Sequence, residues 1–208
     1  MISKAGSRTY ERTQCPPRRQ RLSAMERCLL KWAVIDRDDR VLDVGLGNGL
    51  MAEYLLRNME CEVCGVADDM ELVRTTRGLV RSADLVYAAA GDIPWRDQAF
   101  HTVLLRPCRM DGFAMENQLR EVHRVLKEGG QLVMGMKNLP ALFRSVVDAA
   151  AESTEEAAES ATRRQMMKQL SQLGFEQMSW HPCGFFSGAL VAWKRNPLEE
   201  QFKKGEYE

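Results

Sequence analysis

The sequence predicts an α/β fold, a seven-stranded and mostly parallel sheet with helices on both faces. Short apolar runs alternate with segments of helical period along most of the chain. Such alternation is typical of parallel strands that are joined by helices. A loop alone separates the last two apolar runs, which predicts an antiparallel pair at one edge of the sheet. With 208 residues the chain is long enough for one domain with its own core.

The first half of the chain predicts three strands. An amphipathic helix at 22–33 comes before them and is expected to pack on the core or cap it. The strands are short apolar runs between turn residues, and helical period follows the first two. We expect strands at 40–44, 62–67 and 85–89, and helices at 50–59 and 69–80.

The second half continues the alternation and then closes the sheet. A strand at 102–106 is followed by a helix at 115–126, which Gly129 and Gly130 end. After the strand at 131–136 we expect a helix around 141–151 and another that ends at Leu173, before Gly174. The closing strands are predicted at 176–181 and 189–194.

Charge and hydropathy exclude several classes of protein. The chain has 29 basic and 29 acidic residues, and a dedicated nucleic-acid binder would usually be strongly basic. No apolar run reaches about 18 residues, so no membrane span is expected. Residues 1–21 hold six basic residues against one acidic residue, a net charge of +5. We expect a basic, flexible arm at 1–21, one domain at 22–195 and a polar tail at 196–208.

The six cysteines do not suggest a metal site. Cys61 and Cys64 form a C-x-x-C pair, but they lie in an apolar, strand-like stretch at 61–66, where residues three apart point to opposite faces. No second pair exists to complete a four-ligand zinc site, so we expect no metal. Six expected thiols, and an N-terminal arm without the apolar run of a secretory signal, predict a cytoplasmic protein.

The strongest chemical signal is a glycine-rich turn at 41–49, with the sequence VLDVGLGNG. A buried strand ends there and a helix begins directly afterwards. The glycines allow positive φ and let a ligand approach the bare backbone. The start of the helix offers N–H groups without partners to the negative end of a ligand.

The spacing of this turn argues against a dinucleotide. The dinucleotide fingerprint needs a third small residue where this chain has Leu50. Asp43 stands two residues before Gly45, and an acid so close to the turn suits a cationic ligand better than a diphosphate. S-adenosylmethionine carries an ammonium and a sulfonium, so it fits this pattern.

From residue 41 to 194 the chain resembles class I S-adenosylmethionine-dependent methyltransferases of the small-molecule type, near those of ubiquinone and menaquinone biosynthesis. The glycine turn resembles the first motif of the family. Two further segments agree in order and spacing. Ile93-Pro94-Trp95 with 99–103 is similar to the family's LPF…SFDxV, and 119–130, LREVHRVLKEGG, is similar to LREIxRVLKPGG. The resemblance implies a Rossmann-like fold with an antiparallel edge strand.

The resemblance also implies site residues. The residues that would hold the methionine end of S-adenosylmethionine are Asp43, Gly45, Leu46, Gly47 and Gly49. The family's acid for the ribose hydroxyls falls on Ala67, a departure from the family pattern. Asp68, the next residue, is expected to take that role, with Asp69 and Met70 near the adenine.

Two more departures concern the adenine side. The family's acid for the adenine amino group falls on Ala89, and Asp92 is the candidate replacement, with Ile93 packing on the ring. His101 stands where the family has the aspartate of its SFD segment. Arg106, after the fourth strand, is a candidate to bind an anionic group of the cofactor or substrate; the alternative is a solvated loop charge.

The resemblance implies in-line methyl transfer to a small-molecule acceptor. A general base is optional in such a reaction, and the sequence identifies no catalytic residue. The acceptor site is expected to be open, small, or completed by a second subunit in a homodimer. Because of the departures, the alternative function is a methyltransferase-like cofactor-binding or regulatory module with weak or lost catalysis.

Overall fold

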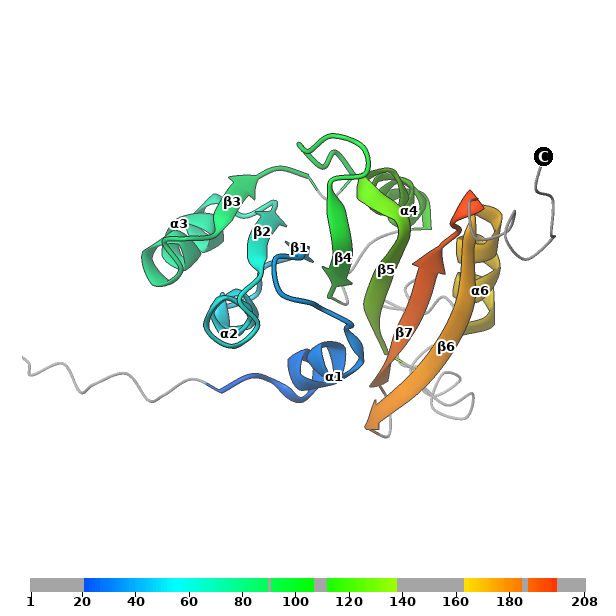
Figure 1. Ribbon diagram of the computed structural model, residues 1–208, viewed down its shortest axis with the longest axis horizontal. Coiled ribbons are helices and arrows are strands. Elements are labelled where there is room, and N and C mark those ends of the chain that lie inside the picture. Colours follow the sequence, from blue (N-terminus) through cyan, green and yellow to red (C-terminus); the bar gives the residue numbers. More distant parts are fainter. Residues whose placement is uncertain (1–20, 90, 107–111, 138–162, 185–186, 198–208) are drawn as a thin grey trace, which may run out of the picture.

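The computed structural model describes residues 21–89, 91–106, 112–137, 163–184 and 187–197 (Figure 1). Its strands are β1 (Arg40–Val44), β2 (Glu62–Ala67), β3 (Asp84–Tyr87), β4 (Phe100–Leu105), β5 (Leu126–Lys137), β6 (Phe175–Gly184) and β7 (Ser187–Lys194). The helices in these residues are α1 (Ala24–Trp32), α2 (Leu50–Asn58), α3 (Met70–Leu79), α4 (Gly112–Val125) and α6 (Arg163–Gln172).

These strands form one sheet in the order β3-β2-β1-β4-β5-β7-β6. The strands β1 to β5 pair in parallel with their neighbours, whereas β7 runs antiparallel to both β5 and β6. The predicted fold class is confirmed, including the antiparallel pair at one edge. The chain moves outward from β1 through β2 to β3 and then returns to the other side of β1 with β4, so the order of strands reverses between β1 and β4. Open α/β sheets bind ligands beyond the carboxyl ends of the strands at such a point.

Most predicted elements are present, with some shifted ends. The first two strands have the predicted bounds. The largest shift is at β5, which begins five residues before the predicted 131, because Leu126 already pairs with Phe100 and the register then shifts before Thr102. The helix predicted around 141–151 lies outside the described residues, as do most of the N-terminal arm and the C-terminal tail.

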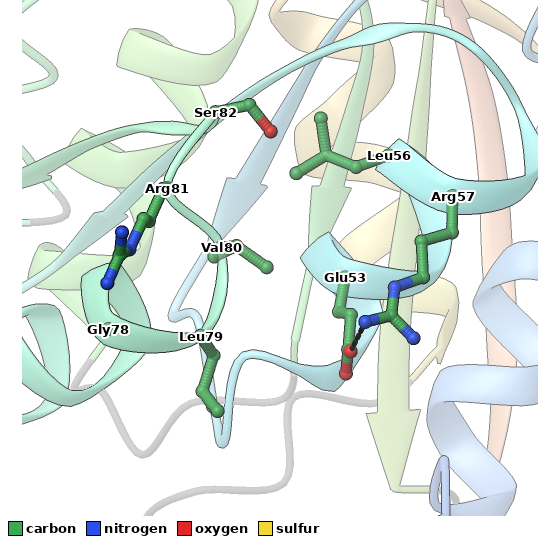
Figure 2. Close-up of a pocket in the computed structure, with 8 residues that line it drawn as sticks. All are labelled: Glu53, Leu56, Arg57, Gly78, Leu79, Val80, Arg81 and Ser82. Atoms are coloured by element: carbon green, nitrogen blue, oxygen red, sulfur yellow. Dashed lines mark ion pairs between the residues drawn. The ribbon is translucent and has the colours of Figure 1, made fainter.

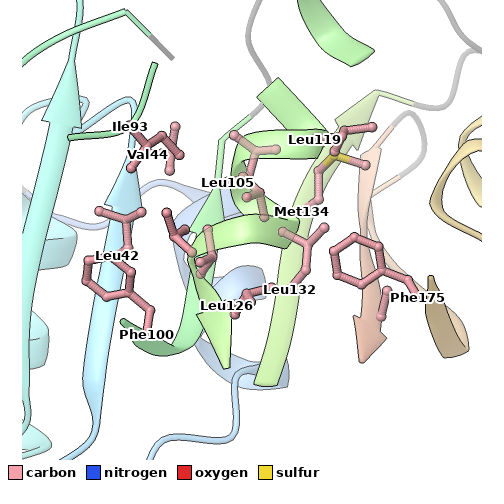
Figure 3. Close-up of a cluster of buried hydrophobic side chains, with 14 of the residues drawn as sticks. Leu42, Val44, Ile93, Phe100, Leu105, Leu119, Leu126, Leu132, Met134 and Phe175 are labelled. Atoms are coloured by element: carbon pink, nitrogen blue, oxygen red, sulfur yellow. The ribbon is translucent and has the colours of Figure 1, made fainter. Parts of the chain in front are cut away.

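The sheet separates two apolar cores. One lies between the sheet and the helices α4 and α6, and Figure 3 shows Leu42, Phe100 and Leu119 among its side chains. The other lies beneath α1, α2 and α3, the helices on the opposite face in Figure 1. Cys61 belongs to this second core and Cys64 to the first, so the predicted divergence of the two thiols is confirmed.

Strand periodicity determines which side chains meet at the carboxyl edge. In β1, Leu42 and Val44 enter the core of α4 and α6, so Asp43 faces the helices α1 to α3. In β4, Leu104 enters the core of α1 to α3, and two residues further Arg106 lies on that same face. Asp43 is paired with Leu104 across the two strands. An acid and a base therefore lie on one face, at the point where the strand order reverses.

In the described part of the chain, no helix combines the length and the apolar character that crossing a membrane requires.

Candidate cofactor site

The glycine turn begins directly after β1. Gly45, Gly47 and Gly49 all have positive φ, at 94°, 53° and 77°. The N–H of Gly45 donates to the carbonyl oxygen of Val66 in β2, at 2.8 Å, which fixes the start of the turn to the sheet. Leu46 is fully buried and fastens the turn to the core beneath α2. The three glycines adopt these angles without strain, while Leu46 between them also has a positive φ, of 29°.

The turn leads into the first residues of α2. Gly49 is the N-cap and provides no side chain, although Asn48 Oδ1 accepts a hydrogen bond from the N–H of Leu50 at 3.2 Å. The other N–H groups of a first helical turn have no partner within the helix. The start of α2 therefore keeps donors for a ligand at this edge.

Asp43 is the buried acid of the site. Its Oδ2 accepts a hydrogen bond from Arg106 Nη2 at 3.1 Å, and its side chain is completely buried. Its Oδ1 has no hydrogen-bond partner among the described residues. Burial raises the pKa of the Asp43 carboxyl, against the opposing charge of Arg106. A buried carboxylate oxygen without a donor is costly, which marks this atom as a place for a ligand's donor.

Arg106 is not a solvated loop charge. Its side chain is 14% exposed and lies between two acids, with Nη1 2.8 Å from Glu26 Oε1 and Nη2 on Asp43. Its guanidinium also lies directly against the glycine turn, because a Cβ added to Gly47 would stand 2.7 Å from Arg106 Cζ and overlap Nη1. The Nε of Arg106 is buried and has no partner in the described part of the chain.

Glu26 is a site residue that sequence reasoning missed. Its Oε2 accepts from the N–H of Ser23 at 2.7 Å, and Ser23 Oγ accepts from the N–H of Glu26 at 3.1 Å. This capping box begins α1, and its Ser-x-x-Glu spacing is visible in the sequence. The second use of Glu26, as the partner of Arg106, depends on how α1 packs and has no local signal.

The residues after β2 have different surroundings. Asp69 Oδ1 accepts from the N–H groups of Glu71 and Leu72, at 2.9 and 3.1 Å, so this side chain caps α3. Asp68 is exposed at the carboxyl end of β2 and takes no part in the cap. Met70 is 45% exposed. The predicted contacts of these residues with a nucleoside stay predictions.

Hydrogen bonds to side chains of α4 fix the backbone of the segment after β3. Ile93 is buried at 2% exposure, and its N–H donates to Glu121 Oε2 at 3.0 Å. Arg124 donates to the carbonyl oxygens of Ile93 and Trp95, at 2.9 and 2.8 Å. Asp92 is exposed beside this fixed backbone. Contact of Asp92 and Ile93 with an adenine ring likewise stays a prediction.

One departure from the family pattern lies away from this edge. His101 is at the amino end of β4, where its Nδ1 accepts from the N–H of Arg40 at 2.8 Å and its Nε2 lies 2.6 Å from Lys127 Nζ. It therefore connects the starts of β1 and β4 and does not touch the glycine turn.

A cavity of about 330 Å³ lies elsewhere, between α2 and the end of α3 (Figure 2). Glu53 and Arg57 form an ion pair of 2.9 Å on its α2 side. Leu79 and Val80 line the opposite side. None of the predicted site residues lines this cavity.

Comparisons with known proteins point to methyltransferases. A family model described as a methyltransferase domain matches residues 42–134. A ubiquinone/menaquinone biosynthesis C-methyltransferase from Xanthomonas oryzae is 33% identical over 116 residues, which cover 52% of this chain and 46% of the relative. The chain thus spans about half the length of the curated relatives that it matches.

Solved structures show the same fold at low identity. The [4+2]-cyclase SpnF has a TM-score of 0.68 and 17% identity, over 82% of this chain and 80% of its own. A phosphoethanolamine N-methyltransferase from Haemonchus contortus, in complex with S-adenosyl-L-methionine, has a TM-score of 0.65 and 14% identity, over 82% of this chain and 52% of its own. At these identities the likeness shows the fold alone.

Proposed function

We propose that this chain, which belongs to the class I S-adenosylmethionine-dependent methyltransferases, transfers a methyl group from S-adenosylmethionine to a small-molecule acceptor by in-line displacement. The observation that carries the proposal is the glycine turn beside the buried Asp43, at the point where the strand order reverses. Both features suit the amino-acid end of this cofactor.

The chemistry of the turn supports a fit to that end. Asp43 Oδ1 is a buried acceptor without a donor, and the cofactor's ammonium would supply one. The positive-φ glycines would let the methionine chain lie against backbone. Arg106 covers Gly47 and Asp43 Oδ2 in this conformation, so the fit requires its guanidinium to move. We propose Asp43, Gly45, Leu46, Gly47 and Gly49 as the residues that hold the methionine end.

Asp68 is our candidate for the ribose. It is exposed at the carboxyl end of β2 and takes no part in the cap of α3, whereas Asp69 Oδ1 is committed there. Asp69 would then act on the ligand only by fixing the start of α3, with Met70 beside the adenine. Asp92 and the braced backbone at Ile93 would complete the adenine side.

The chain's own residues bind, orient and exclude water in this proposal. When bound, S-adenosylmethionine supplies a methyl group that the sulfonium activates. Transfer then requires an acceptor aligned with the carbon–sulfur bond, and alignment alone gives a large rate enhancement. No side chain of the described residues is assigned as a general base.

A second candidate function is a cofactor-binding or regulatory module without catalysis. The observation that favours it is the guanidinium of Arg106 on the glycine turn, together with the alanines at positions 67 and 89. Calorimetry separates the two functions when it is combined with a methyl-transfer assay on a panel of small acceptors. Cofactor binding without transfer to any acceptor would favour the module.

The decisive binding experiment titrates the full chain with S-adenosylmethionine and with its demethylated product, S-adenosylhomocysteine. We expect one equivalent of each to bind, and Asp68→Ala to weaken binding about 10- to 150-fold, the value of a hydrogen bond to a charged group. Asp84→Ala is the matched control, because Asp84 is an exposed acid at the amino end of β3, away from the carboxyl edge of the sheet where Asp68 lies. An unchanged dissociation constant for Asp68→Ala would refute the ribose assignment, and no binding at millimolar ligand would refute the proposed cofactor.

A further inference from the structure

Arg106 lies where the methionine end of the proposed ligand would bind. Its guanidinium lies on Gly47, and one of its nitrogens donates to Asp43, the acid that is predicted to face the ligand's ammonium. A ligand ammonium on Asp43 Oδ1 would share one carboxylate with the Arg106 guanidinium on Oδ2, so the two cations would repel each other, and the ligand's methionine chain would meet the guanidinium at Gly47. Arg106 in this position therefore competes with the methionine end of the ligand.

The arrangement around Arg106 is only partly satisfied. Arg106 Nε is a buried donor without a partner, and Asp43 Oδ1 is a buried acceptor without a partner in the described chain. Two unsatisfied buried atoms in one ion pair make this arrangement less stable than a fully bonded one. A ligand that brings its own donors to Asp43 would satisfy the orphaned oxygen, and movement would expose Nε to water.

Glu26 can stay paired with the guanidinium of Arg106 after the guanidinium leaves Asp43. The side chain of Glu26 is 6% exposed and contacts a different nitrogen of Arg106 from the one that contacts Asp43. Nη1, which contacts Glu26, is also the guanidinium nitrogen nearest Gly47, so the guanidinium and the Glu26 carboxylate would have to shift together to clear the turn, keeping their contact and losing the one to Asp43. Displacement therefore breaks one ion pair and leaves the other, which lowers its cost.

We propose that Arg106 is an internal competitor for the cationic end of the cofactor, held on Asp43 in the free protein and retained by Glu26 when the cofactor displaces it. The inference rests on the proposed function, because it takes S-adenosylmethionine as the ligand. It assigns Arg106 the role of setting cofactor affinity, in place of the ligand-holding role that the sequence suggests.

The expected change in cofactor affinity follows from the hydrogen bond between Arg106 and Asp43. The affinity that is measured equals the intrinsic affinity multiplied by the fraction of molecules in which the turn is free. A hydrogen bond between charged groups corresponds to about a 10- to 150-fold change in an equilibrium constant. We therefore expect Arg106→Ala to bind S-adenosylhomocysteine at least about tenfold more tightly than the wild type.

A truncated ligand makes the test specific. Methylthioadenosine has the nucleoside and the sulfur but no amino-acid end, so it does not compete with Arg106 for Asp43. We expect its affinity to be the same in Arg106→Ala and in the wild type, within about twofold. Arg120→Ala is the matched control, because Arg120 is an exposed arginine on α4 that pairs with Glu116.

Added guanidinium provides a second readout. Guanidinium chloride at low millimolar concentration should refill the space in Arg106→Ala and weaken the binding of S-adenosylhomocysteine, whereas sodium chloride at equal ionic strength should not. A residue with a merely structural role would not give this ion-specific competition. If Arg106→Ala does not fold, Arg106→Lys replaces it, since an ammonium cannot span both acids as the forked guanidinium does. A smaller gain in affinity is then expected.

The outcomes separate this inference from the proposed function. If the wild type fails to bind and Arg106→Ala binds, the inference holds and the proposed function fails. If both bind but the variant binds equally or more weakly, the proposed function holds and the inference is overturned. An equal gain for methylthioadenosine also overturns it, and no binding by either protein overturns both.

Discussion

Removing Glu26 should destabilise the protein far more than removing an ordinary surface acid. Glu26 has two bonded oxygens, one in the capping box of α1 and one on Arg106. Loss of one partner from a buried ion pair costs about 3–5 kcal/mol, and loss of a helix cap about 0.5–2 kcal/mol. Because Arg106 keeps Asp43 as a partner, we take the low end of the first range. Glu26→Ala should then lower the free energy of unfolding by about 4 kcal/mol.

The conservative variant separates charge from shape. Glu26→Gln retains an oxygen for the cap and a similar volume but loses the charge, so its expected cost is about 1–2 kcal/mol. Urea unfolding followed by circular dichroism measures both variants, and the melting temperature should fall by about 2–4 °C for each kcal/mol. Glu116→Ala is the control, because that acid forms an exposed pair with Arg120, worth less than about 1 kcal/mol. If Glu26→Ala costs no more than Glu116→Ala, the Glu26–Arg106 pair does not hold α1 to the sheet, and the reasoning fails.

Three further predictions concern the turn, the cap of α3 and pH. Gly49→Ala should lower the free energy of unfolding by about 1–2 kcal/mol, since φ is 77° and the new Cβ would lie 2.7 Å from Thr76 Cγ2. Gly78→Ala is the control, because its Cβ meets no atom within 4 Å. Equal losses for the two variants in urea unfolding would contradict this prediction. Asp69→Ala should lower the free energy of unfolding by about 0.5–2 kcal/mol, because α3 loses its cap. Its affinity for the nucleoside should stay within about twofold of the wild type. A loss of about tenfold or more in calorimetry would instead make Asp69 a direct ligand. Burial, with Lys194 adding to it, lowers the pKa of His123 from 6.5 to about 4, so the folded state favours the neutral ring. Stability is therefore complete above pH 6.5 and declines as pH falls from 6.5 toward 4, by up to about 1.4 kcal/mol per pH unit. His123→Gln should remove this slope, and an unchanged slope would assign it to other groups.

Local patterns predicted the parts of the molecule that local forces determine. The strands β1 and β2 have the predicted bounds because apolar runs and turn residues mark both ends. The glycine turn at 45–49 was equally visible, since three closely spaced glycines after a strand favour positive φ angles, which all three adopt. The predicted divergence of Cys61 and Cys64 needed no more than the period of a strand.

The ion cluster of the site could not be predicted in the same way. Arg106 and Glu26 are 80 residues apart, and Arg106 and Asp43 are 63 apart. Their meeting depends on β1 lying beside β4 and on α1 packing over the same face, both of which are tertiary facts. The sequence predicted Arg106 to follow the fourth strand, but its burial between two acids has no local signature.

Neighbouring acids were also hard to distinguish from the sequence. Asp68 and Asp69 are adjacent, and either can follow a strand or cap a helix. The structure commits Asp69 to two backbone N–H groups of α3 and leaves Asp68 outside the cap. Similarly, the early start of β5 depends on a pairing between Leu126 and Phe100 that no pattern near Leu126 indicates.

The fold alone does not decide the reaction. A cyclase and a methyltransferase both share this architecture with the chain at low identity. Function therefore has to be argued from the site. In this chain the site combines a turn of three positive-φ glycines with an acid whose second oxygen lacks a partner in the described residues.

A crystal structure of the full chain with S-adenosylhomocysteine tests this account most directly. We expect the ligand's ammonium within hydrogen-bond distance of Asp43, its methionine chain against Gly47, and the Arg106 guanidinium off Asp43 and Gly47 but still paired with Glu26. A ligand bound elsewhere, or a glycine turn that Arg106 still covers at saturating ligand, would contradict the account.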